Sequence, residues 1–108
     1  MRRVLFDENM PRKLQRDLPE FFIRTAQEEG WSAFKNGQLL KRAAGAFDVL
    51  VTIDQNMRYQ QNMSGLTIGI VAIEVPDTRL ACLRALTSEI RDAIQRVKSG
   101  EVVTVGPA

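Results

Sequence analysis

Short apolar runs alternate along this chain with amphipathic segments, and the alternation predicts strands and helices in turn. Five runs rich in apolar, aromatic or β-branched residues are interpreted as strands, over residues 3–7, 21–25, 49–53, 67–73 and 101–105. The runs at 49–53 and 67–73 are apolar on both faces, which is typical of central strands in a parallel sheet. These two runs are therefore predicted to lie inside the sheet.

Helical spacing and helix-ending residues predict the segments between the strands. Pro11 opens a predicted helix over 11–17, and Asn36-Gly37 marks the entry to a second helix in the middle of the chain. The longest helix is expected to begin at Asp77 or Thr78, to continue to about residue 99 and to end at Gly100. Shorter helical turns are expected at 27–31 and within the polar loop 55–65, around 57–61.

Strands that alternate with helices predict an α/β fold. We expect a three-layer sandwich with a mainly parallel central sheet of four to five strands. The 108 residues fit one domain, so residues 1–108 are interpreted as a single unit.

Composition narrows the possible chemistry. The absence of histidine excludes His-ligated zinc and Ser-His-Asp catalysis, and the one cysteine, Cys82, cannot form an intramolecular disulfide. The longest apolar run is too short to span a membrane, and the first strand leaves no room for a signal peptide. We therefore expect a cytoplasmic protein without a membrane partner. The net charge of +2 is compatible with a nucleic-acid partner but does not by itself indicate one.

Acidic residues follow the predicted strands. Asp7 and Glu8 come after the first strand, Asp54 follows the central strand, and Glu74 follows the strand at 67–73. Ligands of open α/β sheets bind beyond the carboxyl ends of the strands, where carboxylates from neighbouring strands repel unless a cation lies between them. Mg²⁺ or Mn²⁺ suits such oxygen ligands and can activate water for phosphodiester hydrolysis. Either aspartate alone is better explained as a turn or helix-cap residue, whereas the pair on two neighbouring apolar strands favours a functional site.

Basic and polar residues are expected around this edge of the sheet. Arg12 and Lys13 follow the first strand and can contact phosphates, although a solvated helix face explains them as well. The polar loop after Asp54 contains Arg58 and Gln61, which can hydrogen-bond an unpaired base.

Two segments carry a resemblance to a known family. Val-Leu-Phe-Asp-Glu-Asn-Met-Pro at 4–11 and Phe-Asp-Val-Leu-Val-Thr-Ile-Asp-Gln-Asn at 47–56 resemble the hallmark segments of small PIN-like domains of the DUF5615 type. These domains are similar to the C-terminal module of Mut7 proteins and to the toxin ribonucleases of toxin–antitoxin pairs. The likeness extends from the first strand through the strand at 67–73.

The resemblance implies a metal-dependent ribonuclease that binds Mg²⁺ or Mn²⁺ and cuts single-stranded RNA. By position, Asp7 and Asp54 would be the metal ligands and catalytic acids, and Glu8 an auxiliary acid. Asn9 would fix the turn after the first strand, and Thr52 would place a hydroxyl near the metal. A small antitoxin protein and a second copy of the chain are the partners that such a toxin would bind.

The sequence departs from that pattern in two places. The family often has an acid at the start of the middle helix, but residues 32–47 contain none, and Asn56 stands where a second acid is usual. Asn36, Gln38 and Asn56 can instead coordinate through carbonyl oxygens or hydrogen-bond a phosphate. The departures favour an alternative, a catalytically silent PIN-like module that acts through a protein partner. A response-regulator-like receiver is a third reading, but residues 73–76 lack the lysine that it requires.

Overall fold

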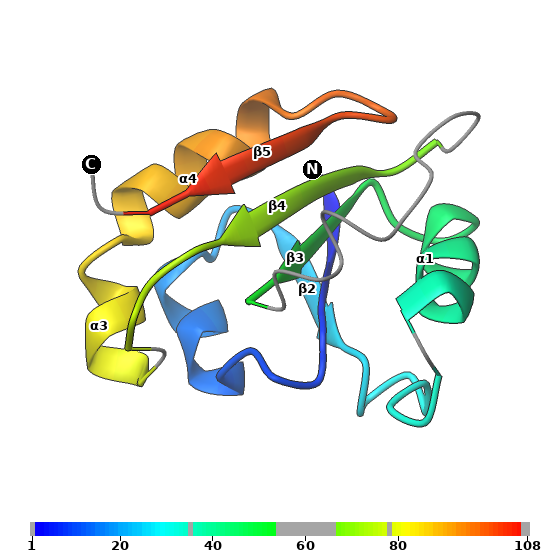
Figure 1. Ribbon diagram of the computed structural model, residues 1–108, viewed down its shortest axis with the longest axis horizontal. Coiled ribbons are helices and arrows are strands. Elements are labelled where there is room, and N and C mark those ends of the chain that lie inside the picture. The colour runs from blue at the N-terminus through cyan, green and yellow to red at the C-terminus, as the bar shows by residue number, and fades with distance from the viewer. Residues whose placement is uncertain (1, 35, 54–66, 78, 107–108) are drawn as a thin grey trace.

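The computed structural model contains one parallel sheet covered by helices on both faces (Figure 1). It describes residues 2–34, 36–53, 67–77 and 79–106. The sheet order is β2-β1-β3-β4-β5, and every neighbouring pair is parallel. The strands are β1 (Arg3–Phe6), β2 (Phe22–Thr25), β3 (Val49–Thr52), β4 (Gly69–Ile73) and β5 (Val102–Val105). The predicted α/β class and parallel sheet are confirmed.

The helices divide between the two faces of the sheet and produce the expected three layers. Helix α1 (Asn36–Ala44) covers one face. The 3-10 helix η1 (Arg12–Asp17) and the α-helices α3 (Leu80–Arg84) and α4 (Thr87–Arg96) cover the other. Two neighbouring parallel strands need a long crossover connection, usually a helix, because a tight turn cannot bring the chain back to the end of the sheet where the next strand begins.

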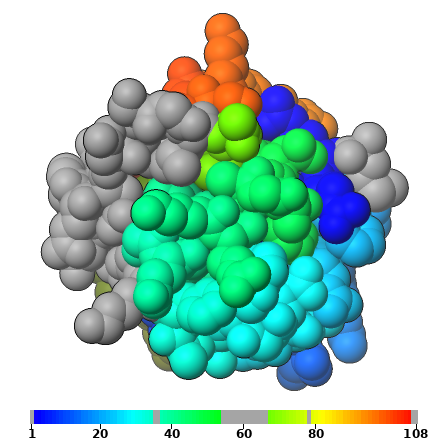
Figure 2. Space-filling model, turned by 90° about the vertical axis from the view of Figure 1, so that its right-hand side faces the viewer, coloured from blue at the N-terminus to red at the C-terminus, as the bar shows by residue number. Residues whose placement is uncertain are grey.

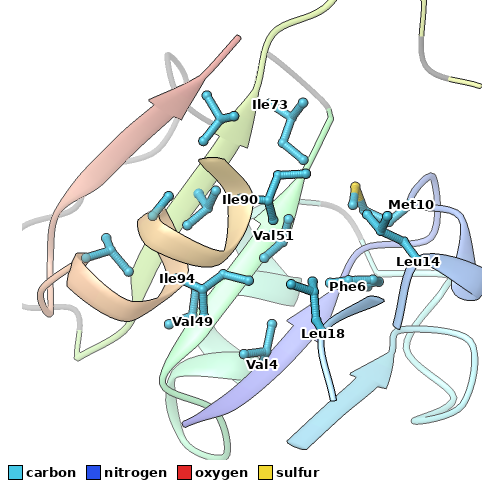
Figure 3. Packing of buried hydrophobic residues seen from close by; sticks show 14 of the residues in the cluster. Val4, Phe6, Met10, Leu14, Leu18, Val49, Val51, Ile73, Ile90 and Ile94 are labelled. Atoms are coloured by element: carbon cyan, nitrogen blue, oxygen red, sulfur yellow. The ribbon is translucent and has the colours of Figure 1, made fainter. Parts of the chain in front are cut away.

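Side chains of the central strands alternate between two hydrophobic cores. Leu5 and Leu50 face α1, whereas Phe6 and Val51 pack on the opposite side with Leu14 of η1. Figure 3 shows this second core, where residues of η1 and α4 lie over β1 and β3. Burial on both faces explains why the runs at 49–53 and 67–73 lack the polar alternation of a half-exposed strand.

The direction in which the sheet is built reverses beside β1. From β1 the chain moves to β2 on one side, and it then crosses to β3 on the other side. Phe6 pairs with Val51, and the Asp7 N–H donates to the Val51 carbonyl at 3.1 Å. The carboxyl ends of β1 and β3 therefore form the topological switch point, where open α/β sheets bind their ligands.

The single long helix predicted over residues 77–99 is wrong, because the structure divides it into α3 and α4. Leu86 leaves the helical conformation, and the Thr87 hydroxyl donates to the Arg84 carbonyl at 2.7 Å. The two pieces have different supports: Arg84 of α3 bonds Asp17 of η1 at 2.9 Å, whereas α4 packs on β4 and β5. One straight helix cannot follow both surfaces.

The ends of this helical region also differ from the prediction. Helix α4 ends at Arg96, and Gly100 instead takes a left-handed φ of 77° in the turn before β5. Arg2 supports the end of α4, because its guanidinium donates to the carbonyl oxygens of Ile94 in the last turn and of Val97 just after the helix, at 3.1 and 2.6 Å. None of the helices described here has both the length and the apolar character that crossing a bilayer requires.

Gly69 at the start of β4 lies too close to the segment after α4 to carry a side chain. A Cβ there would be 2.8 Å from Val97 Cγ2 and 2.9 Å from the Lys98 carbonyl oxygen. We expect Gly69→Ala to lower the free energy of unfolding by about 1–3 kcal/mol, because backbone must move to admit the methyl group. Urea denaturation of both proteins measures this change.

Gly45→Ala is the matched control, since the nearest atom to its Cβ would be the Arg42 carbonyl oxygen at 3.7 Å. Equal stability of the Gly69→Ala and Gly45→Ala proteins would contradict the close approach of β4 to this segment.

Candidate functional site

Asp7 is the residue at the centre of the candidate site. It follows the last residue of β1 at the switch point and is 4% exposed. Its Oδ1 accepts the Asn9 N–H at 3.0 Å, and its carbonyl accepts the Met10 N–H at 3.2 Å. The side chain therefore stabilises the turn that leads from β1 toward η1, as the turn interpretation expected.

The second carboxylate oxygen of Asp7 faces the neighbouring strand. Thr52, the last residue of β3 and fully buried, donates its hydroxyl to Asp7 Oδ2. Two residues that are distant in sequence thus meet because β1 and β3 pair in parallel and end together. Hydrogen bonds to an ionised carboxylate are stronger than neutral ones, so Thr52 also fixes the orientation of Asp7.

A pocket of about 40 Å³ opens beside Asp7. Its polar wall consists of Asp7, Glu8 and Asn9, and its apolar wall comes from the segment between β2 and α1 and from α1 itself. The apolar wall is formed by Ala26, Trp31, Phe34 and Leu39, with Ser32 beside them. This volume holds an ion or a few waters, and a whole nucleotide is far larger.

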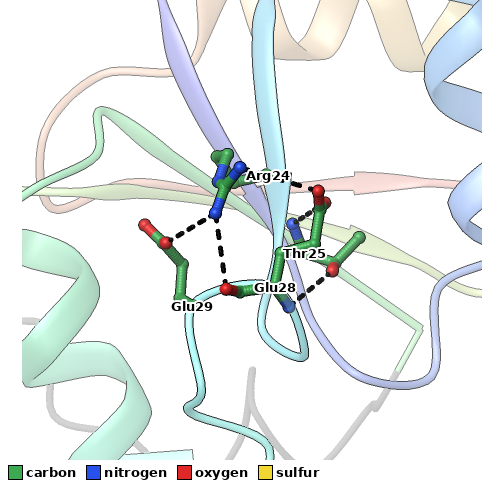
Figure 4. A network of polar contacts seen from close by, with 4 residues as sticks. All are labelled: Arg24, Thr25, Glu28 and Glu29. Atoms are coloured by element: carbon green, nitrogen blue, oxygen red, sulfur yellow. Dashed lines mark hydrogen bonds and ion pairs between the residues drawn. The ribbon is translucent and has the colours of Figure 1, made fainter.

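The apolar wall is held in place by hydrogen bonds in the turn that follows β2 (Figure 4). The Thr25 hydroxyl accepts the Glu28 N–H at 3.1 Å, and Glu28 Oε1 accepts the Thr25 N–H at 3.0 Å. This reciprocal pair is a capping box, and Gly30 ends the turn with a φ of 75°. The Gln27 amide donates to the Glu8 carbonyl at 2.8 Å, which joins the two walls of the pocket.

Glu28 is ionised more readily in the folded protein than in a free chain. The Thr25 N–H that it accepts lowers the pKa of the Glu28 carboxyl below its ordinary value of 4.5, and the Thr25 hydroxyl and the Arg24 charge act in the same direction. Arg24 lies 3.6 Å from Glu28 and 3.2 Å from Glu29. The turn that supports the pocket wall is therefore stabilised by negative charge.

The structure brings some of the predicted site residues together and separates others. Glu8 and Asn9 join Asp7 at the pocket, and Thr52 contacts Asp7 directly. Arg12 and Lys13 are exposed at the start of η1, which packs under the opposite face of the sheet, and neither is among the residues that line the pocket. Asn36 is the first residue of α1.

Four predicted site residues lie outside the described part of the chain. They are Asp54, Asn56, Arg58 and Gln61. Among the residues that the structure does describe, no three or more acidic or cysteine side chains gather as a metal site. The described part of the pocket therefore presents Asp7 and Glu8 as its carboxylates.

Sequence reasoning missed the side chains that shape the pocket from the β2–α1 segment. Trp31 and Phe34 pack against the edge of the core on the α1 side, and both also line the pocket. The capping box had a readable signal, because Thr25-x-x-Glu28 has the required spacing. The position of Phe34 had no signal in the sequence, because it depends on how α1 packs on the sheet.

The hydrogen bond from Thr52 to Asp7 is expected to be a measurable part of the stability. Thr52→Val keeps the shape of the side chain but leaves a buried carboxylate without that donor, so we expect the free energy of unfolding to fall by about 1–3 kcal/mol. Thr104→Val makes the same change at an exposed position of β5 and should alter stability by less than about 0.5 kcal/mol. Urea denaturation without added metal compares the two, and equal effects would refute a role for Thr52.

The lowered pKa of Glu28 predicts a dependence of stability on pH. Because the folded pKa lies below the unfolded value of 4.5, ionised Glu28 stabilises the fold above pH 4.5 and loses this contribution as the pH falls through the folded pKa. The free energy of unfolding should therefore decline more steeply with acidification in the wild type than in Glu28→Gln. Glu89→Gln, which removes one carboxylate at an exposed position of α4, is the matched control.

Comparison with known proteins adds no assignment. No family model, no curated protein and no solved structure matches this chain. The functional interpretation consequently depends on the residues of the site and on the sequence resemblance.

Proposed function

We propose that this protein is a PIN-like, divalent-metal-dependent ribonuclease that acts on single-stranded RNA. The observation that supports the proposal most is the buried Asp7 carboxylate at the switch point, oriented by Thr52 and facing a polar pocket. A carboxylate held in one orientation at the carboxyl ends of two central strands is a suitable ligand for a divalent cation, which prefers oxygen atoms.

The donor set of the pocket suits a hard cation. Asp7, Glu8 and Asn9 would bind a cation through oxygen atoms, and Mg²⁺ is commonly held by one or two carboxylates together with waters and substrate phosphates. Asp7 would hold the ion together with Asp54. A bound ion would supply an activated water and stabilise the charge that develops on the phosphodiester.

The protein side chains have separate roles in this proposal. Thr52 orients the Asp7 carboxylate beside the pocket. Glu8, which also lines the pocket, would exchange protons with water as an auxiliary acid. Seven further residues predicted from the sequence are proposed to bind RNA: Asn9, Arg12, Lys13, Asn36, Asn56, Arg58 and Gln61. We propose that this protein is the toxin of a toxin–antitoxin pair, that a small antitoxin protein binds and neutralises it, and that it forms a homodimer.

A response-regulator-like receiver is the one other reading with a structural observation in its favour. The order 2-1-3-4-5 of an all-parallel sheet is shared with that class of fold. A receiver needs a lysine at the end of a late strand, whereas Glu74 follows β4 and Gly106 follows β5. We therefore rank it below the ribonuclease.

Metal binding is the first expected outcome of this proposal. Mn²⁺ should raise the thermal stability of the wild type by mass action, by about 2.7 kcal/mol at 100 times the dissociation constant. Asp7→Asn and Asp54→Asn should abolish both this stabilisation and the heat of binding in calorimetry. The wild type with Mn²⁺ should cut an unstructured RNA, and neither variant should.

Asp92→Asn is the matched control, because it removes one exposed carboxylate from α4 and should leave binding and cleavage unchanged. Folded variants are identified by their thermal transitions without metal. A wild type that binds no Mn²⁺ at millimolar concentration would rule out the nuclease and favour the silent module that acts through a protein partner.

A further inference from the structure

A second hollow lies on the outer surface of α1, beyond the Asp7 pocket. It has a volume of about 320 Å³ and is lined by Phe34, Gln38, Lys41 and Arg42, and we call it the Phe34 groove. Gln38, Lys41 and Arg42 share one face of α1 by their spacing, opposite the buried Leu39, Leu40 and Ala43, and Phe34 precedes the helix. Figure 2 shows this side of the molecule, with α1 at its centre and the β2–α1 segment beside it.

The groove is connected to the candidate site through one side chain. Phe34 lines both the Asp7 pocket and the Phe34 groove. The pocket is too small for a nucleotide, whereas the groove reaches the lower end of the range for small-ligand sites, about 300 Å³. A substrate with its reacting phosphate at Asp7 therefore has room for its next nucleotide across Phe34.

The groove carries positive charge, and no carboxylate of the described residues is paired with it. Lys41 and Arg42 are exposed and form no ion pair within the part of the chain that the structure describes. By contrast, Arg24, Arg84 and Arg91 each bond a carboxylate. No acidic residue occurs between Ser32 and Phe47, so α1 carries only positive charge.

Arg42 also has a defined orientation. Its guanidinium lies over the Phe34 ring, 5.5 Å from the ring centroid. A guanidinium supported by an aromatic ring is a flat cationic surface on which an unpaired base can stack, and its charge can meet a phosphate. The groove thus combines the two elements of single-strand binding sites, a cationic track and a stacking surface.

We propose that the Phe34 groove binds a single-stranded polynucleotide, with Lys41 and Arg42 contacting phosphates and Phe34 with Arg42 stacking an unpaired base. This inference rests on the proposed function, since it extends the same substrate away from Asp7.

The test is fluorescence anisotropy with labelled RNA and DNA single strands of about ten nucleotides. All measurements contain EDTA, so that no cleavage occurs. Lys41→Gln/Arg42→Gln should bind both strands about tenfold more weakly than the wild type. The dependence of log Kd on log salt should become shallower by about 1.4, because each single-strand phosphate contact contributes about 0.7. Phe34→Leu should weaken binding while it retains the wild-type salt dependence, since it removes stacking and no charge.

Arg96→Gln/Lys98→Gln is the control, because it removes the same charge at exposed positions of α4 and beyond it. If both double variants weaken binding equally, or if Lys41→Gln/Arg42→Gln binds like the wild type, the groove is not the binding site. The anisotropy assay contains no metal, so its result is independent of the manganese titration. If the wild type binds no Mn²⁺ but Lys41→Gln/Arg42→Gln still weakens the binding of single strands, the proposed nuclease function is wrong and the groove proposal stands. If the wild type cuts RNA with Mn²⁺ but Lys41→Gln/Arg42→Gln binds single strands as tightly as the wild type, the groove proposal is wrong and the nuclease proposal stands.

Discussion

The parallel pairing of β1 with strands on both of its sides is the constraint on which the rest of the structure depends. Four residues of β1 pair with β2, and three of them pair with β3 as well. Because every pair is parallel, each connection must cross a face of the sheet, and the covering helices follow from that requirement. The apolar side chains of Val4, Leu5 and Phe6 must then be buried on both faces at once.

The same pairing places a carboxylate where a polar group is costly. Asp7 is nearly as buried as the core around it, and it is stabilised by the Asn9 N–H and the Thr52 hydroxyl. Its role in the turn and a role in metal binding are compatible, because a carboxylate can accept about four hydrogen bonds. The hydrogen bonds of the turn account for the stability of a buried aspartate at position 7. The pocket that this aspartate lines is consistent with a role for its charge in binding a cation.

Much of this arrangement was predictable because it depends on local pattern. Apolar runs without alternation predicted β3 and β4, and acids after such runs predicted the edge of the sheet where Asp7 lies. The break at Leu86 was not predictable, since the apolar spacing continues unchanged from Leu80 to Val97 and only the separate packing surfaces divide the helix. The Phe34 groove depends likewise on tertiary packing, which brings a loop aromatic beside a helix face.

The two hollows on the α1 side of the sheet differ in charge in a way that suits one polyanionic ligand. Asp7 and Glu8 line a small pocket, where a phosphate would be repelled unless a cation lay between them. Lys41 and Arg42 line the larger groove, where a phosphate is attracted directly. Phe34 separates the two charges and belongs to both hollows. A single strand that crosses this ring would meet fixed positive charge on one side, and on the other it would need the divalent cation that the acidic pocket is suited to hold.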